Sequence, residues 1–167
     1  QNQSSAASDV YKRQFLIFSY IFFFKLSYIH IMDYNKPFNF LKNLPPKLNS
    51  FYKTKSKTGL VVSNKSKSKK DFDPVTNFDR AFEKYIRLLI NKKFPKDSII
   101  GEEFEDKFSS NNYKWSIDPI DGTRAFVIGA PTWSNLISLS FKERSLIGLA
   151  NFPELEKYYI CLLYTSD

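Results

Sequence analysis

The segment Thr76–Phe94 reads TNFDRAFEKYIRLLINKKF and carries the clearest helical pattern in the chain. Its apolar side chains recur at the spacing of one helix face, and charged or polar side chains take the other side. The apolar set is Phe78, Phe82, Tyr85, Ile86 and Leu89, and the polar set is Arg80, Glu83, Lys84, Arg87 and Asn91. Thr76 with Asp79 three residues later predicts a capping box. Lys92 and Lys93 suit the negative end of the helix dipole, and Pro95 predicts its end.

Short strand-like runs follow this helix. They are Ser98–Gly101, Lys114–Asp118, the alternating run Asn135–Phe141 with Ile137, Leu139 and Phe141 on one face, Leu146–Phe152 after a turn at Lys142–Ser145, and Lys157–Ile160. Helices followed by an antiparallel-looking series of strands predict an α+β domain, a layered α/β sandwich with two helices and a mainly antiparallel sheet.

Two features precede the helix. Asn39–Lys57 has apolar residues at helical spacing but contains Pro45 and Pro46, so a helix there must be interrupted or begin at the prolines. Lys53–Lys70 holds seven lysines separated by serines. This segment lacks interleaved aromatics and arginines, so a solvated loop or hairpin is favoured over a phosphate-backbone grip.

Composition narrows the classes of protein to consider. The chain has 167 residues, of which 43% are hydrophobic and 25% charged, so it can bury a core. One cysteine excludes a disulfide framework or a multi-thiolate zinc site, and one histidine, His30, excludes imidazole clusters. The net charge of +8 comes mostly from lysine in a chain rich in amino acids with A/T-rich codons, so it does not by itself indicate an anionic partner.

The two ends share an unusual relation. A DNA sequence that encodes Cys161–Asp167 has a reverse complement that, read one base in, encodes Ser8–Gln14. We therefore expect residues 1–14 and 161–167 to be translated adapter sequence. For residues 15–31, translated upstream DNA is favoured over a membrane anchor. Their apolar run, Phe15–Phe24, is shorter than the roughly 17–25 residues that span a bilayer, and no signal cleavage site follows it. The expected domain is residues 32–160, which begin at Met32. We expect this domain to be incomplete at its C-terminal end.

Carboxylates stand where the predicted strands stop. They are Asp73 in Asp-Pro-Val-Thr, Glu102 and Glu103 after Gly101, and Asp118 and Asp121 in Ile-Asp-Pro-Ile-Asp-Gly-Thr. Gathered at one sheet edge, these acids would repel each other unless cations lay among them. Hard oxygen ligands of this kind suit Mg²⁺. Each motif also has a plain structural interpretation: a turn with an N-cap for Asp118–Thr123, and surface glutamates for Glu102 and Glu103.

The Asp118–Thr123 loop gives each position a physical role. Asp118 and Asp121 can direct oxygens to one spot, and Pro119 stiffens the turn while leaving the Ile120 carbonyl free. Gly122 lets the backbone approach a ligand, and Thr123 is expected to cap a short helix whose N–H groups would hold a phosphate.

Together these motifs, with Trp115 before the loop and Gly129-x-Pro131 after it, resemble the inositol monophosphatase family in order and spacing. Phe72–Thr76, Gly122–Phe126 and Gly129-Ala-Pro-x-Trp133 look most like its histidinol-phosphatase branch. The resemblance covers roughly residues 65–160, the N-terminal half to two-thirds of a family member. It implies the sugar-phosphatase type of layered fold, without its C-terminal layer.

The resemblance also implies roles for individual residues. Metal ligands would be Glu102, Asp118, the Ile120 carbonyl and Asp121. Glu103 would be an outer carboxylate, Asp73 and Thr123 would orient the attacking water, and Gly122 and Thr123 would cradle the phosphate. Arg124 and Trp133 follow the loop closely and are weaker candidates for substrate contact, and core packing is favoured for Trp133. A further metal-binding Asp and most substrate-selecting residues of the family match nothing in this chain.

The implied reaction is hydrolysis of a small phosphate monoester by a water molecule activated by two or three Mg²⁺ ions. Outside residues 1–31 and 161–167 there is no cysteine or histidine to form a phosphoenzyme, and Asp118 and Asp121 are three apart rather than two as in haloacid dehalogenases.

Histidinol phosphate is the leading substrate, with inositol or related sugar phosphates second. The resemblance further implies a homodimer at full length, and we expect a cytoplasmic protein without a nucleic-acid or membrane partner.

Two other outcomes stay open. One is a lysine-rich module that binds anions or nucleic acid, whose binding would depend steeply on salt and survive Asp118→Asn. The other is an inactive fragment. An exposed apolar sheet and a missing ligand would make this chain aggregation-prone and catalytically feeble, even if its parent gene encodes a competent enzyme.

Overall fold

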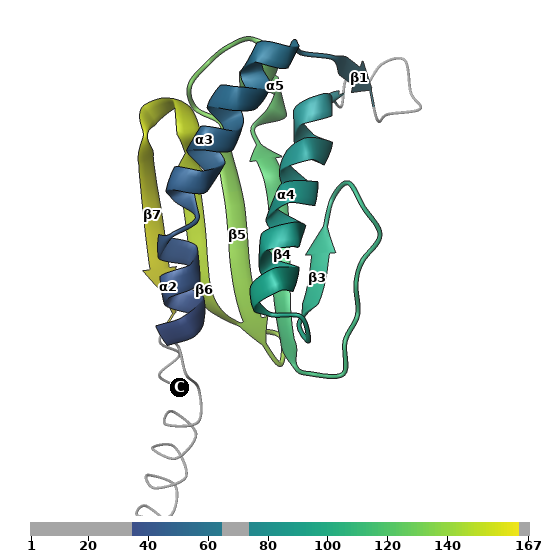
Figure 1. Cartoon of the computed structure of the whole chain (residues 1–167), viewed down its shortest axis with the longest axis vertical. Coiled ribbons are helices and arrows are strands. Elements are labelled where there is room, and N and C mark those ends of the chain that lie inside the picture. The colour runs from purple at the N-terminus through teal and green to yellow at the C-terminus, as the bar shows by residue number, and fades with distance from the viewer. Residues whose placement is uncertain (1–34, 65–73, 164–167) are drawn as a thin grey trace, which may run out of the picture. The chain divides into compact units, whose positions relative to one another are not determined.

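The computed structural model describes residues 35–64 and 74–163, drawn in colour in Figure 1. The chain divides into two compact units, residues 1–37 and 38–167. Of the first unit only residues 35–37 are described, and they begin helix α2 (Asn35–Lys42). Expectations for residues 1–34, 65–73 and 164–167 therefore lie outside the described residues. The predicted boundaries at residues 14, 31 and 160 stay predictions.

The prolines divide the first helical segment, as expected from the sequence. Helix α2 ends at Lys42, and α3 (Pro45–Lys55) begins with Pro45 in its first turn, where a missing N–H costs little. A short 3₁₀ turn, η1 (Ser56–Thr58), follows. Strand β1 (Val62–Asn64) then pairs antiparallel with β2 (Pro74–Thr76), so the hairpin form expected for the lysine-rich segment is found at β1. The expected loop is wrong at the start of that segment, because Lys53 and Lys55 continue helix α3 and Lys57 lies in η1.

Helix α4 (Asn77–Lys93) begins with the predicted capping box. The Thr76 hydroxyl accepts the N–H groups of Phe78 at 3.1 Å and Asp79 at 3.4 Å, and Asp79 Oδ2 accepts the Thr76 N–H at 2.7 Å. These bonds satisfy donors that a helix start leaves free. Phe94 is the C-cap, so both predicted ends are confirmed.

The two faces of α4 differ from the prediction in one respect. Phe78, Phe82 and Ile86 are buried as expected, and Ile90 joins them. Glu83, predicted on the polar side, is instead completely buried at 0% exposure. The sequence period places Glu83 away from the apolar stripe, but part of that side is covered by the loop after β3, which the Glu83 carboxylate binds.

Five strands form the main sheet in the order β3-β4-β5-β6-β7. Their bounds are β3 Ser98–Gly101, β4 Tyr113–Asp121, β5 Ser134–Phe141, β6 Arg144–Phe152 and β7 Lys157–Leu162. Strands β3 and β4 are parallel, and β4 to β7 are antiparallel. Helix α5 (Thr123–Val127) follows β4, and a 3₁₀ turn, η2 (Pro153–Leu155), precedes β7. The α+β class and the mainly antiparallel sheet are confirmed.

Four of the five strands are longer than expected: β5 begins one residue earlier, β7 ends two residues later, and β4 and β6 also extend. Strand β4 runs through Pro119 to Asp121, with a shift in pairing between Asp118 and Asp121 that accommodates the proline. The turn before β6 is tighter than predicted because Lys142 and Glu143 take positive φ angles of 47° and 63°. Positive φ at both central residues is the geometry of a two-residue hairpin that matches strand twist.

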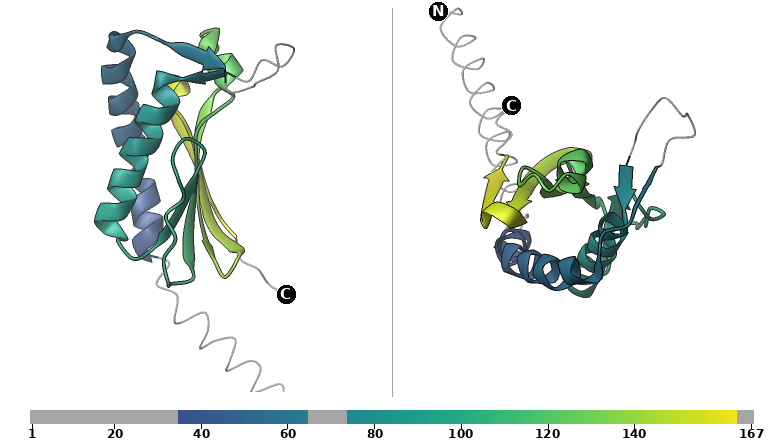
Figure 2. Two further views of the ribbon diagram at one scale, coloured as in Figure 1. Left: turned by 90° about the vertical axis from the view of Figure 1, so that its right-hand side faces the viewer. Right: turned by 90° about the horizontal axis from the view of Figure 1, so that it is seen from above.

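Within residues 38–163, helices α3 and α4 lie on one face of the five-stranded sheet (Figure 2). Large aromatic side chains fill the space between the layers, with Trp115 and Trp133 both at most 1% exposed. Phe82 of α4 lies 6.0 Å from Trp133, centroid to centroid, and Phe40 of α2 lies 5.5 Å from Trp115. Contacts between aromatic side chains therefore hold the helices against the sheet. None of the described helices is long and apolar enough to cross a membrane.

Candidate metal and phosphate site

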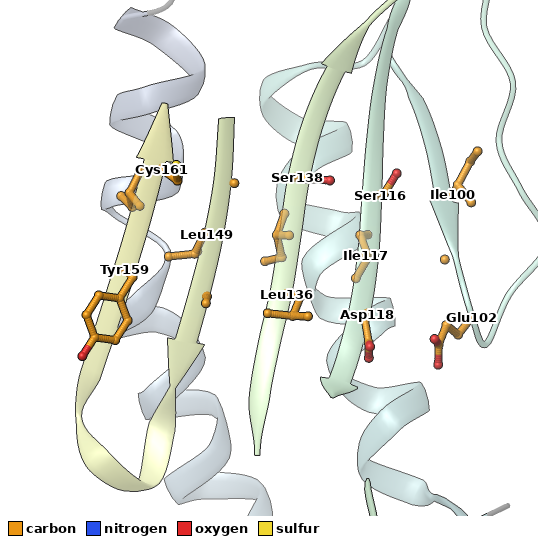
Figure 3. Close-up of a pocket in the computed structure, with 15 residues that line it drawn as sticks. Ile100, Glu102, Ser116, Ile117, Asp118, Leu136, Ser138, Leu149, Tyr159 and Cys161 are labelled. Carbon is orange, nitrogen blue, oxygen red and sulfur yellow. The ribbon is translucent and has the colours of Figure 1, made fainter. Parts of the chain in front are cut away.

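Parallel pairing brings two acidic strand ends together. Gly101, the last residue of β3, is paired with Ile117 of β4, so Glu102 and Asp118 follow at the same edge of the sheet. Figure 3 shows the carboxylates of Glu102 and Asp118 near one another at one end of a groove. The convergence expected for these two acids from the sequence is therefore found in the structure.

The electrostatics of Asp118 reflect that crowding. Its pKa is raised from 3.8 to about 6, first because burial removes water from the carboxylate, and then because Glu102, Asp121 and Asp79 add negative charge nearby. The N–H of Ile120 donates to Asp118 and opposes this rise. Asp118 is thus the centre of a negatively charged group, a setting that a divalent cation would neutralise.

The donors fit Mg²⁺ in kind, since they are carboxylate oxygens at a strand edge. Their arrangement is looser than expected: among the described residues, no three His, Cys, Asp or Glu side chains are grouped closely enough to hold one ion. Asp121 is exposed and accepts a long bond of 3.5 Å from the Ser134 hydroxyl. The structure therefore places Glu102 and Asp121 each near Asp118, without a shared three-carboxylate centre.

The loop after Asp118 is held by neutral groups. Pro119 O accepts the buried side-chain amide of Asn135 at 2.6 Å. Asn151 in turn donates its amide to Asn135 Oδ1 and Asn49 Oδ1, both at 3.0 Å, which extends the network from the sheet to α3. Gly122 adopts φ 83°, a left-handed conformation that favours glycine.

Thr123 does not cap the following helix. Gly122 is the N-cap of α5 and makes no side-chain capping bond, and the Thr123 hydroxyl donates to the Ile120 carbonyl at 3.0 Å. The expectation of a threonine cap is wrong because the hydroxyl lies one residue inside the helix, within reach of the carbonyl three residues back. That bond instead stabilises the turn carrying the Ile120 carbonyl, a candidate metal ligand that still has a second lone pair.

The other candidates fall in different surroundings. The Glu103 side chain is 2% exposed and lies 3.8 Å from Arg80 Nε, which suits an outer supporting carboxylate better than a direct ligand. Trp133 is 1% exposed and contacts Tyr52 and Phe126 at centroid distances of 5.1 and 4.9 Å, so the core-packing interpretation is confirmed. Arg124 is exposed on α5. Asp73 lies outside the described residues.

Sequence reasoning missed two supporting residues. Glu83 is buried beneath the Glu102–Glu103 turn, and its α4 position gave no sign of that contact. The adjacent Gly101 was an available signal, because a glycine at a strand end indicates close approach of another group. Asn135 was read only as part of an alternating strand, and its amide bond to Pro119 O depends on the tertiary fold.

The groove beside these acids has a volume of about 590 Å³ and lies along one face of the sheet (Figure 3). Ile100, Leu136 and Tyr159 contribute apolar surface, and Glu102 and Asp118 lie at one end. The groove therefore combines an apolar surface with an anionic end.

Comparison with known proteins identifies a family and relatives to which this chain is similar. The family model described as "Inositol monophosphatase family" matches residues 44–163. The histidinol-phosphatase of Chlorobaculum parvum is 46% identical over 92 residues, which cover 55% of this chain and 36% of the relative. The histidinol-phosphatase of Mycobacterium tuberculosis is 38% identical over 90 residues, which cover 54% of this chain and 35% of the relative.

A solved structure shares the fold. The staphylococcal IMPase-I complexed with products superposes with a TM-score of 0.69 and 16% identity, over 78% of this chain and 49% of that one. The chain thus spans about a third of the length of the two histidinol-phosphatases and about half of this structure. Because the family model covers well over half of the sequence, the chain belongs to the inositol monophosphatase family.

Proposed function

We propose that the protein contributes the metal- and phosphate-binding edge of a Mg²⁺-dependent phosphatase that hydrolyses a small phosphate monoester. The observation that carries the proposal is the convergence of the Glu102 and Asp118 carboxylates at one edge of the sheet, where β3 and β4 run parallel. Burial and the charges of Glu102, Asp121 and Asp79, which raise the pKa of Asp118 to about 6, support it. A site that concentrates negative charge in this way serves a cation better than it serves a phosphate alone. Family membership supports the same reaction class.

Each residue has a proposed task. Glu102, Asp118, Asp121 and the Ile120 carbonyl would hold two or three Mg²⁺ ions, and Glu103 would support them from a buried position. Mg²⁺ supplies a Lewis acid that polarises the phosphoryl group and lowers the pKa of water. The chain's own contribution is to orient the phosphate through Gly122 and Thr123, while Asp73 and Thr123 are the proposed partners of the attacking water.

Gly122 suits the phosphate role because of its backbone conformation. A Cβ atom built on Gly122 would lie 3.6 Å from Trp133 Cα, so the residue has room for a side chain, and its positive φ is what favours glycine. Without a side chain, its backbone is open to an anionic ligand. The Thr123 hydroxyl keeps its bond to Ile120 O in the described structure, and we propose that it re-orients when substrate is present.

Histidinol phosphate is the proposed substrate. The support is the 46% and 38% identity to two histidinol-phosphatases, which extends over about half of this chain. Histidine biosynthesis, a cytoplasmic location and a homodimer follow from the same resemblance and stay predictions. Inositol or related sugar phosphates are the alternative, supported by the name of the matching family itself.

Phosphate release tests the proposal. The purified 167-residue protein is incubated with histidinol phosphate or inositol 1-phosphate, with MgCl₂ or with EDTA, beside Asp118→Asn. We expect release that requires Mg²⁺, is lost in Asp118→Asn and is faster with histidinol phosphate. Even a slow rate decides the matter, because each condition is compared with the variant. Equal release by the parent and Asp118→Asn, or release in EDTA, would contradict the proposal.

The lysine-rich binding alternative predicts a different result. A module that grips nucleic acid through its lysines would bind single- or double-stranded DNA with a steep loss of affinity as salt rises. Asp118→Asn would leave that binding unchanged. The described structure places Lys53 against Glu156 at 2.5 Å, so at least this lysine already has an acidic partner. The proposed phosphatase function predicts no salt-dependent DNA binding from the parent protein.

A further inference from the structure

A buried charge lies directly beneath the metal-site candidate Glu102. Glu83 of α4 is 0% exposed, and a carboxylate is rarely buried to that extent without partners. Its Oε2 accepts the N–H of Glu102 at 3.0 Å and the N–H of Glu103 at 2.7 Å. Its Oε1 accepts Arg87 Nε at 2.7 Å. Both oxygens are therefore used, and the negative charge is balanced within the same helix.

Arg87 extends the contact to the next residue of the loop. While its Nε binds Glu83, its Nη2 donates to the carbonyl of Phe104 at 3.1 Å. Arg80, two turns before Arg87 on α4, lies 3.8 Å from the Glu103 carboxylate. Arg80, Glu83 and Arg87 are three and four residues apart and share one helix face. This face therefore holds the backbone and one side chain of Glu102–Phe104.

Gly101 shows how closely the strand end approaches Glu83. A Cβ atom at Gly101 would lie 2.2 Å from Glu83 Oε1 and 2.5 Å from its Cδ. Contacts below 3.0 Å are not tolerated by real side chains, and the buried Glu83 is fixed by its hydrogen bonds, so it has little freedom to move away. The missing side chain at Gly101 is thus explained by the carboxylate that occupies the space.

The side chain of Glu102 points the other way. It is exposed and lies at the end of the groove beside Asp118 (Figure 3). Because two successive backbone N–H groups are bound by one carboxylate, the peptide planes on either side of the Glu102 Cα are fixed. The direction of the Cα–Cβ bond, and hence of the carboxylate, follows from those planes. Supporting contacts of this kind orient metal ligands and affect affinity about 10–100-fold.

We infer that Glu83 is a positioning residue for the divalent-ion site. Its buried carboxylate holds the backbone of Glu102 and Glu103 so that the Glu102 carboxylate faces Asp118. The inference rests on the proposed function, because it assigns to Glu83 a role toward a cation that the phosphatase would use. Glu83 itself does not touch the ion or the substrate.

Glu83→Gln is the deciding variant. Glutamine keeps the shape and can still accept one or both N–H groups, but its NH₂ group would face the Arg87 donor. Asp97→Asn is the matched control. Asp97 is also buried, at 8% exposure, and accepts Trp115 Nε1 at 2.9 Å and Asn111 Nδ2 at 2.7 Å. It precedes β3, whereas Glu102 follows that strand.

Mg²⁺ alone, titrated by calorimetry into the full chain, is the first measurement. We expect Glu83→Gln to weaken Mg²⁺ binding by about 10-fold or more. Asp97→Asn should lower the unfolding midpoint yet keep the dissociation constant within about twofold, because its contacts do not reach a ligand. Hydrogen exchange is the second measurement: the amides of Glu102 and Glu103 should exchange roughly 10-fold faster or more in Glu83→Gln, through loss of charge-assisted bonds.

The outcomes separate the two claims. A parent protein that binds no Mg²⁺ overturns the proposed function and, with it, the role of Glu83 toward an ion. A parent that binds Mg²⁺ beside a folded Glu83→Gln of equal affinity overturns the inference alone, as does an equal loss in Asp97→Asn. Should Glu83→Gln not fold, Glu83→Asp decides, because its shorter carboxylate cannot span both amides and Arg87. Parental Mg²⁺ affinity in folded Glu83→Asp would then overturn the inference.

Discussion

The two acidic strand ends of the site are supported by opposite kinds of chemistry. The turn at Gly101–Glu103 lies on a buried ion pair, with Glu83 bound to Arg87 at 2.7 Å and to two backbone N–H groups. The turn at Asp118–Thr123 is held by neutral groups: the Asn135 amide on Pro119 O and the Thr123 hydroxyl on Ile120 O. The ion pair beneath Glu102 fixes the backbone and leaves no space for a side chain at Gly101. The neutral groups beneath Asp118 add no charge next to a carboxylate that already has negative neighbours.

That difference has a functional logic. Asp118 already has the negative neighbours Glu102, Asp121 and Asp79. A further negatively charged group beneath it would raise its pKa beyond about 6. The Glu83 charge is tolerated beneath the other turn because Arg87 balances it. We therefore expect substitutions on the charged side to cost more than those on the neutral side.

The largest effect is expected from Gly101→Ala. The added Cβ would meet Glu83 Oε1 at 2.2 Å, and the buried carboxylate can move only by breaking its bonds. Overpacking of this kind costs about 3 kcal/mol in the free energy of unfolding. Urea unfolding measures it. Gly148→Ala is the control, because a Cβ there meets nothing within 4 Å and should cost less than about 0.5 kcal/mol. Equal stability of the two variants would show that Glu83 does not fill the space beside Gly101.

A smaller loss is expected from Asn135→Ala. Asn135 is 0% exposed, and its removal takes away the partner of Pro119 O and of one of the two Asn151 amide N–H groups. A buried group left unsatisfied costs about 2 kcal/mol. Asn43→Ala, which removes an exposed amide bond to Asn39 O, should cost less than about 0.5 kcal/mol in the same urea assay. If both variants unfold at the same urea concentration, the neutral network contributes nothing to the turn.

The next change isolates backbone strain at Gly122. Alanine has room there, with its nearest contact at 3.6 Å, but the φ of 83° is unfavourable for a residue with a side chain. We expect Gly122→Ala to cost about 1 kcal/mol. Gly129→Ala should cost the same, since Gly129 has φ 74° and open space. A much larger loss at Gly122 would mean that its surroundings, and not its conformation, require glycine.

The smallest effect concerns pH. The pKa of Asp118 is about 6 in the folded protein and 3.8 for an ordinary aspartate, so the folded state binds the proton more tightly. Stability from this group is therefore highest below pH 4 and falls as pH rises from about 4 to 6. Solvent screens part of the effect because Asp118 is only half-buried. Thermal unfolding of the parent and Asp118→Asn across this range should show a steeper decline in the parent, and adding Mg²⁺ should reduce that decline.

Sequence reasoning predicted the elements whose signals are local. The Thr76–Asp79 capping box, the proline break before α3 and the strand Ser98–Gly101 depend on neighbouring residues, and all three are found. The acids at the strand ends were also recognisable, because strand limits and glycine mark them. The parallel pairing of β3 with β4, which sets Glu102 beside Asp118, came only with the structure.

What the sequence could not predict depends on contacts between distant segments. The helical period assigned Glu83 to the polar side, and only the loop after β3 makes that position buried. Thr123 was expected to cap α5, yet a hydroxyl one residue inside the helix binds Ile120 O instead. The three-acid centre was expected from motif spacing, but among the described residues no three acids are grouped closely enough to hold one ion. The strand register and the length of each side chain determine which of these groups come into contact.

Titration of Mg²⁺ into the parent chain and Asp118→Asn by calorimetry tests the central claim most directly. If the strand-end carboxylates bind a divalent ion around Asp118, the parent will bind Mg²⁺ measurably. The affinity of Asp118→Asn will be lower by about 10-fold or more, and circular dichroism will show that the variant is folded. A parent that takes up no Mg²⁺, or a folded Asp118→Asn that binds it equally well, would contradict the account.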